Sequence, residues 1–210
     1  SAPKIHQLRE SASAYRYQRL QQLLGENGKN TVQKTVSILR DRKGLHDADI
    51  GMGNEKALNQ LIAHHSIIFE PQKLLVWVST SPWQLGEFVA YDLRKIFAMQ
   101  GLQENHEIYE PSLTIAADTF LLTPQYKNFE EYRRYKQSVA DGVEVNTDSL
   151  IASNPQFYHA YVLAGDYCSL HGRWKDALQY YGQALTKEIA TKQEEDYIRK
   201  QIATIQKKEQ

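Results

Sequence analysis

The residues of this chain that most resemble a catalytic arrangement are His64, His65 and Ser66. A histidine beside a serine can act as a general base that activates the hydroxyl as a nucleophile. On a β-strand, however, neighbouring side chains point to opposite faces, so His64 and Ser66 share a face while His65 points away. The sequence places no carboxylate to orient either imidazole. Three interpretations stay open: a hydrolytic Ser–His pair, a structural histidine, and the lining of a pocket.

A metal or phosphate site is not predicted near these residues. The spacing of the paired histidines to His46 or His106 matches no metal-binding motif. The segment Gly51-Met52-Gly53-Asn54 lacks the third glycine and the Lys-Ser/Thr ending of a phosphate-binding loop. We interpret it as a tight turn in which Asn54 hydrogen-bonds its own loop. The sequence therefore predicts no metal ion and no cofactor.

A second candidate site is the turn Trp83-Gln84-Leu85-Gly86, which follows Pro82 between two apolar segments. Its indole is suited to form the floor of an apolar acyl pocket, and it is equally suited to cover the edge of a sheet. The sequence does not choose between these two interpretations.

Three β-strands are predicted to position these residues. The first two, at 62–70 and 73–79, are joined by Pro71-Gln72, and the third covers about 87–92. Runs such as Leu74-Leu75-Val76-Trp77-Val78 are continuously apolar. A continuous apolar run is typical of a strand that is buried on both faces.

Helices are predicted on both sides of the strand region. Apolar spacing favours helices at about 6–24 and 32–40, the second capped by Asn30-Thr31. Residues 55–63 are expected to form a short helix or an approach to the first strand. Residues 126–140 are expected to form a heavily charged helix.

From Asn154 onward the apolar period is helical, with Asn154 as the N-cap and Pro155 at the first helical position. The helices predicted from this point cover about 156–171, 174–187 and 193–207.

Part of this helical segment matches the spacing of a tetratricopeptide repeat. The matching positions are Gly165, Gly172, Trp174, Ala177, Tyr181 and Ala184. One repeat cannot bury its own faces, so two roles stay open: a packing cap or dimer contact, and a peptide-binding surface. Cys168, the single cysteine, is expected to be a buried apolar residue rather than a nucleophile.

Composition disfavours several classes of function. The 210 residues include 25 basic and 25 acidic side chains, so the formal net charge is zero. Nucleic-acid-binding surfaces usually carry a basic excess, so no nucleic-acid partner is expected. No apolar run is long enough to cross a bilayer, and no signal peptide opens the sequence as given.

Five segments between residues 39 and 93 match a known family in their residues and in their order along the chain. They are Leu39-Arg40-Asp41-Arg42, Ile50-Gly51-Met52-Gly53-Asn54-Glu55, Ala63-His64-His65-Ser66-Ile67-Ile68-Phe69, Leu75-Val76-Trp77-Val78-Ser79 and Gly86-Glu87-Phe88-Val89-Ala90-Tyr91-Asp92-Leu93. Together they resemble the C-terminal part of bacterial acyl-CoA:6-aminopenicillanate acyltransferase-like proteins. These are N-terminal-nucleophile hydrolases related to the choloylglycine hydrolases. The resemblance covers residues 30–97 well and the remainder loosely.

This resemblance implies part of an αββα sandwich over residues 1–125. With the helical tetratricopeptide-like appendage over 126–210, the expected fold class is α+β. In that family, a cysteine exposed as the new N-terminus attacks an amide, and its free α-amine acts as the base. This chain begins with Ser1, which leads into a polar helix rather than a strand. The nucleophile is therefore expected outside the chain, and no catalytic residue is assigned within it.

The resemblance assigns to this chain a lining for the substrate pocket. The predicted lining residues are Asn54, His64, Ser66 and Trp83. The expected partner is the N-terminal part of the same protein, or a second chain, that carries the nucleophile; a homo-oligomer is also open. Relatives of this type often carry export signals upstream, so a periplasmic or cell-surface location is expected if the parent protein has one.

Three functions follow from these observations. The first is the C-terminal portion of an amidohydrolase or acyltransferase, which predicts an exposed apolar sheet face in this chain alone. The second is a non-catalytic interaction module that uses the C-terminal helices. The third is an independent Ser–His hydrolase, which requires Ser66 beside a histidine with a carboxylate behind it.

Overall fold

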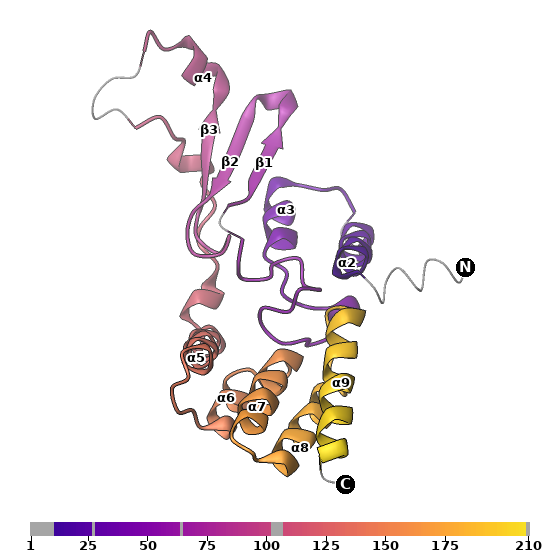
Figure 1. The fold of residues 1–210 in the computed structure, drawn as a ribbon. Helices are drawn as coiled ribbons and strands as arrows, with labels where there is room; N and C mark the ends of the chain where they lie inside the picture. The colour runs from indigo at the N-terminus through magenta and orange to yellow at the C-terminus, as the bar shows by residue number, and fades with distance from the viewer. Residues whose placement is uncertain (1–10, 27, 64, 102–106, 209–210) are drawn as a thin grey trace.

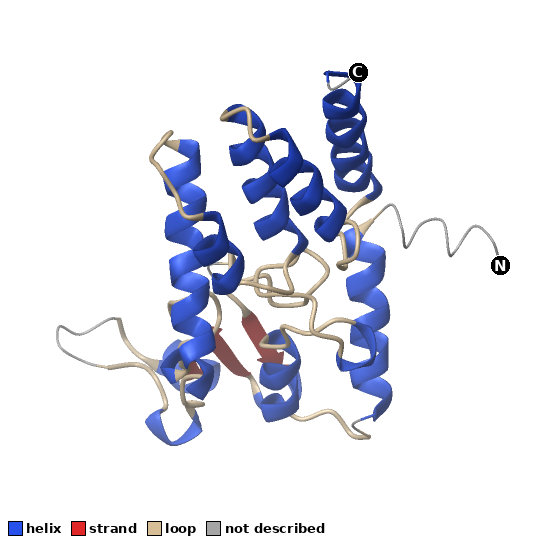
Figure 2. Ribbon diagram, turned by 90° about the horizontal axis from the view of Figure 1, so that it is seen from below, coloured by secondary structure: helices blue, strands red, loops and turns tan. Residues whose placement is uncertain are grey.

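The computed structural model describes residues 11–26, 28–63, 65–101 and 107–208. Within these residues, helices dominate and the strands form one small antiparallel sheet, as the α+β class predicts (Figure 1). The sheet lies toward one end of the molecule, and the helices that follow residue 146 gather at the other (Figure 1). Figure 2 shows how small the sheet is beside the helices. None of the described helices combines the length and the apolarity needed to cross a membrane.

The three strands lie inside the predicted strand regions. Their order is β1 (Ile67–Glu70), β2 (Leu75–Ser79) and β3 (Phe88–Asp92), each antiparallel to its neighbour. A 3-10 turn at Pro71–Lys73 joins β1 to β2, and the short helix α4 (Leu93–Ala98) follows β3 directly.

One face of the sheet is buried within the described chain. The apolar residues on it are Ile68, Leu75, Trp77, Phe88 and Ala90. Val36 of α3 (Val32–Leu39) packs against this face. The opposite face carries Ile67 and Phe69, which are 53% and 64% exposed. The prediction that the strands are buried on both faces is therefore wrong for this chain, because α3 covers one face and the other stays partly open.

Within the described residues, the α-helices before the sheet are α2 (Ala12–Glu26) and α3. The predicted cap of α3 is confirmed, since the Thr31 side chain accepts a hydrogen bond from the Lys34 N–H. Residues 55–63 form turns instead of a short helix. The reason is local: the side chains of Asn54 and Asn59 each accept a hydrogen bond from the N–H two residues later, and such bonds compete with a helix.

The C-terminal half of the chain is helical. Its helices are α5 (Pro124–Ala140), α6 (Thr147–Ser153), α7 (Tyr158–Leu170), α8 (Trp174–Ala184) and α9 (Lys192–Lys208). All except α6 confirm predicted helices to within a few residues. Their hydrophobic core also contains Leu61 and Leu85. The predicted domain boundary at residue 125 therefore separates two segments that contribute to the same hydrophobic core.

The predicted helix start at Asn154 and Pro155 is wrong. Helix α6 ends at Ser153, and α7 begins at Tyr158 with Phe157 as its N-cap. The Asn154 side chain instead donates to the Met52 carbonyl at 2.7 Å and accepts from the Met52 N–H at 3.1 Å. The local sequence predicts that the Asn154 side chain caps a helix, but in the structure it makes a long-range contact with Met52 instead.

Helices α7 and α8 approach each other closely. A Cβ on Gly165 would lie 2.7 Å from the Tyr181 ring, so no larger residue fits there without a shift. Helix α7 is buried around most of its surface. Cys168 is buried as predicted, and burial raises the pKa of its thiol. Because most of α7 is buried, the role of a packing cap fits it better than the role of a peptide-binding surface.

Candidate functional site

The Trp83 turn has an uncommon backbone conformation. Trp83 and Gln84 have φ values of 51° and 65°, both in the left-handed region. The Leu85 N–H donates to the Pro82 carbonyl at 2.7 Å and closes the turn. A residue other than glycine in this region costs about 1–2 kcal/mol. Such strain persists where the surrounding structure fixes it, and it is frequent at functional sites.

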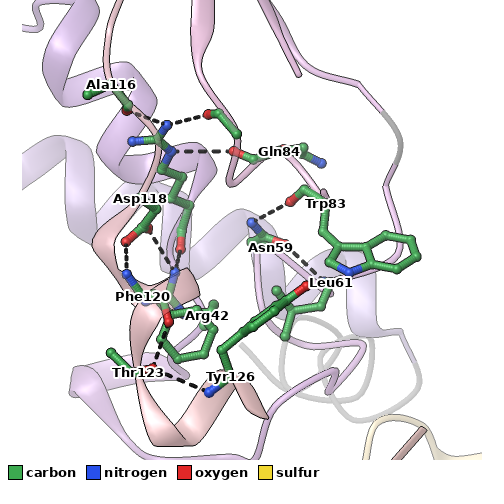
Figure 3. Close-up of polar contacts among 12 residues, drawn as sticks. Arg42, Asn59, Leu61, Trp83, Gln84, Ala116, Asp118, Phe120, Thr123 and Tyr126 are labelled. Carbon is green, nitrogen blue, oxygen red and sulfur yellow. Dashed lines mark hydrogen bonds and ion pairs between the residues drawn. The ribbon is translucent and has the colours of Figure 1, made fainter. Parts of the chain in front are cut away.

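Long-range hydrogen bonds fix this turn (Figure 3). Asn59 donates to the Trp83 carbonyl at 3.0 Å. Arg40 donates to the Gln84 carbonyl at 3.3 Å and to the Gly86 carbonyl at 2.6 Å. The turn carbonyls are therefore held from two other segments, and the Trp83 indole projects away from this network (Figure 3).

Arg40 is a structural residue of the site to which the sequence assigned no role. Its guanidinium also donates to the Ala116 carbonyl at 2.9 Å, so it joins two loops to the end of α3. Burial lowers the pKa of Arg40. These hydrogen bonds all go to neutral backbone carbonyls, so Arg40 acts as a clamp for the backbone.

The two charged residues that follow Arg40 are also structural. Asp41 accepts two hydrogen bonds at 2.9 Å from Arg19, whose side chain is 1% exposed. Arg42 pairs with Asp118 at 3.1 Å, and its guanidinium lies 3.8 Å from the centre of the Phe120 ring (Figure 3).

Ser66 is bound to the turn rather than to a base. Its hydroxyl donates to the side-chain oxygen of Gln84, and its backbone N–H donates to the Ser79 hydroxyl at 2.7 Å. An amide oxygen is not a base that can activate a serine at neutral pH. His65 is exposed, and His64 lies outside the described residues. The described contacts of Ser66 therefore give it a positioning role.

Asn54 has its hydrogen-bonding capacity filled by backbone groups. Its side chain donates to the Ile50 carbonyl at 3.0 Å and to the Glu188 carbonyl at 2.8 Å, and it accepts from the Lys56 N–H at 2.9 Å. It is fully buried. The local turn expected for Asn54 is thus confirmed, and the same side chain also ties this loop to the segment before α9.

Trp83 lines a groove of about 770 Å³ beside the loop of residues 53–62 and helix α5. The apolar floor of this groove consists of Leu61, Phe129, Tyr132 and Phe157. The Arg133 guanidinium lies over the indole, 4.7 Å from the ring centre. Of the predicted pocket residues, Trp83 is the one that the described structure places in this groove.

Titratable side chains lie at one part of the groove. The Tyr158 hydroxyl donates to a carboxylate oxygen of Glu55 at 3.4 Å, and the Tyr132 hydroxyl lies 2.8 Å from His159 Nδ1. Burial raises the pKa of Glu55. Burial, together with the charge of Lys136, lowers the pKa of His159 to about 4, so its imidazole is neutral at pH 7. These groups can bind and orient a polar ligand.

A second surface is the uncovered face of the sheet, called here the open sheet face. Its apolar side chains are Ile67, Phe69, Val76, Val78, Val89 and Tyr91. The register places Ile67 opposite Val78 and Phe69 opposite Val76, so the side chains form one continuous patch. β1 is an edge strand of the sheet. Such a patch marks an interaction site more often than a solvated surface.

No cluster of three or more His, Cys, Asp or Glu side chains among the described residues is arranged to hold a metal ion. Comparisons of this chain with protein-family models, with curated proteins and with solved structures found no match. The function must therefore be inferred from the residues and their geometry.

Proposed function

We propose that this chain is the C-terminal portion of an amidohydrolase or acyltransferase that acts on amide carbon–nitrogen bonds through an N-terminal cysteine located outside the chain. The chain then belongs with the acyl-CoA:6-aminopenicillanate acyltransferase-like N-terminal-nucleophile proteins. It is inactive alone and completes a partner polypeptide that carries the nucleophile.

The open sheet face is the observation that carries this proposal. A three-stranded sheet with apolar side chains on both faces requires a second layer, and α3 supplies that layer on one face only within the described chain. In an αββα sandwich the remaining face packs against a second sheet. Complete burial of a side chain such as Ile67 or Phe69 stabilises by about 1.5–3 kcal/mol, and each is more than half exposed here.

The Trp83 turn supports the same function as a wall of the substrate pocket. It joins the end of β2 to the start of β3, and Arg40, Asn59 and Ser66 hold it in its left-handed conformation. A rigid turn at the end of two strands is suited to present an aromatic side chain to a bound acyl group. The tetratricopeptide-like α7–α8 pair acts in this proposal as a packing cap.

Intact mass spectrometry with N-terminal sequencing of the complex purified from its natural source tests the proposal. We expect a companion polypeptide that begins with cysteine, and hydrolysis of amides by the complex. Detection of the 24.2 kDa chain alone would contradict the proposal.

Matched variants locate the contact with the companion. Phe69→Glu places a charge on the open sheet face and should abolish co-purification while leaving the thermal unfolding of this chain unchanged. Leu170→Glu changes an equally apolar residue that is 79% exposed at the end of α7, and it should leave co-purification intact.

The alternative function is a non-catalytic interaction module that uses the C-terminal helices. The exposed Leu170 is the observation that favours it. The same pair of variants separates the two functions, because the interaction module predicts loss of the partner with Leu170→Glu and retention with Phe69→Glu. For the independent Ser–His hydrolase, Ser66→Ala must abolish hydrolysis. In our proposal the nucleophile lies outside this chain, so the complex with Ser66→Ala still hydrolyses amides, at a rate lowered by loss of the Ser66–Gln84 hydrogen bond.

A further inference from the structure

The groove beside α5 combines an apolar interior with basic side chains on its rim. Phe129, Tyr132 and Phe157 are at most 4% exposed and provide an aromatic floor, in which the Tyr132 and Phe157 rings meet edge to face. Ile62, which is 61% exposed, and Trp83 provide apolar walls. A volume of about 770 Å³ lies within the range of roughly 300–1,000 Å³ that is usual for small-molecule sites.

The charges on the rim favour an anion. Among the described residues, Arg133 and Lys136 form no ion pair with a carboxylate, whereas the neighbouring Arg134 pairs with Glu131. Arg133 and Lys136 are three positions apart on α5, so their side chains lie next to each other and can reach the same ligand group.

Two carboxylates also line the groove and limit where the anion can lie. Glu55 accepts a hydrogen bond from the Tyr158 hydroxyl, and the charge of Lys136 partly offsets the burial that raises the pKa of Glu55. Glu130 lies on α5 three residues before Arg133. The stacking of Arg133 on Trp83 holds its guanidinium above the apolar wall. An anionic group placed between Arg133 and Lys136 therefore has an aromatic surface directly beside it.

From this pattern we infer that the groove binds a small aromatic carboxylate. The ring of the ligand lies against the aromatic floor and the Trp83 wall, and its carboxylate is bound by Arg133 and Lys136. A planar guanidinium matches the two oxygens of a carboxylate in geometry and charge. The inference goes beyond the proposed function, because binding requires neither the companion polypeptide nor a catalytic residue.

Isothermal titration calorimetry of this chain with 2-naphthoate tests the inference. We expect a Kd of about 0.1–1 mM, which is typical for a ligand of this size. The uncharged 2-naphthamide has the same ring system and should bind at least about tenfold more weakly, since it lacks the group that the two cations recognise.

Charge-removing variants on one helix identify the anion site. Arg133→Gln and Lys136→Gln should each weaken 2-naphthoate binding by about two- to fivefold, which corresponds to the loss of one exposed ion pair. Lys127→Gln removes the same charge from α5 outside the groove and should leave binding unchanged. Circular dichroism of each variant verifies that it is folded.

Three results would overturn the inference: no heat of binding with the folded wild-type chain, equal affinity for 2-naphthamide, or equal effects of Lys127→Gln and Arg133→Gln. Each result is independent of whether a companion polypeptide exists. Failure of this inference is therefore distinguishable from failure of the proposed function.

Discussion

Replacement of Asn154 by alanine should strongly destabilise the chain. The Asn154 side chain is 1% exposed, and it satisfies both the N–H and the carbonyl of Met52, at 3.1 and 2.7 Å. Its removal leaves a donor and an acceptor without partners, and each such group costs about 1–3 kcal/mol when buried. Because Met52 is half-buried, water can reach part of the gap. We therefore expect a loss of about 2–4 kcal/mol in the free energy of unfolding.

Urea unfolding of the isolated chain, followed by far-ultraviolet circular dichroism, measures this loss. Domains are commonly stable by about 5–15 kcal/mol, so the change is a large fraction of the total. With a urea dependence of about 2–3 kcal/mol/M, the midpoint should fall by about 1–2 M. The slope of the transition should stay the same, because the surface exposed on unfolding does not change.

Two variants distinguish this long-range role from a helix cap. Asn154→Asp keeps an acceptor for the Met52 N–H but places a second oxygen against the Met52 carbonyl, so it should destabilise about as much as alanine. As an N-cap, aspartate would be as good as asparagine. Asn146→Ala removes the exposed N-cap of α6 and should cost about 1 kcal/mol. A neutral Asn154→Asp, or an alanine effect no larger than that at Asn146, would refute the reasoning.

Two further predictions concern α7 and its neighbour α8. Gly165→Ala should lower stability by about 1–3 kcal/mol because the new methyl group would lie 2.7 Å from the Tyr181 ring. In the control variant, Gly182→Ala, the methyl group meets open space, so this substitution should be neutral or stabilising by up to about 1 kcal/mol. The pKa of His159 is about 4 in the folded chain, against an ordinary value of 6.5. As the pH falls, the unfolded state therefore binds the proton first. The contribution of His159 to stability consequently decreases as the pH drops from 6.5 toward 4.

Thermal unfolding of the two glycine variants measures the first prediction; equal effects at both positions would show that Tyr181 does not restrict the contact. For the second, urea unfolding of wild type and His159→Gln at pH 7.5 and pH 5 gives the pH-dependent difference between them. We expect the advantage of the wild type to shrink at pH 5 by on the order of 1–2 kcal/mol. An advantage that is constant or grows as the pH falls would contradict a buried neutral imidazole.

Local sequence patterns predicted most of the elements. The cap at Thr31, the glycine that follows α7 and the apolar strand regions were each recoverable, because they depend on neighbours within a few residues. Helix α6 was missed, since its seven residues are too few to display a clear apolar period.

The candidate site was predicted in part. The sequence identified the Trp83 turn through its aromatic and glycine residues, and Trp83 does line a groove. It gave no indication that Arg40, more than forty residues away, holds that turn. Asn54 and Ser66 were predicted to line a pocket, and in the structure their polar groups bind their own loop and the turn. The prediction for His64 lies outside the described residues.

The sequence by itself determined most of the helices and all three described strands, together with which of their residues are apolar. The tertiary structure decided which apolar face is covered, which side of the sheet stays open, and which distant carbonyls receive Arg40 and Asn154. The physical reason is that periodicity records the apolarity of a face but not the element that packs on it. A polar side chain likewise carries the same donors and acceptors whether it caps its own helix or joins a segment one hundred residues away.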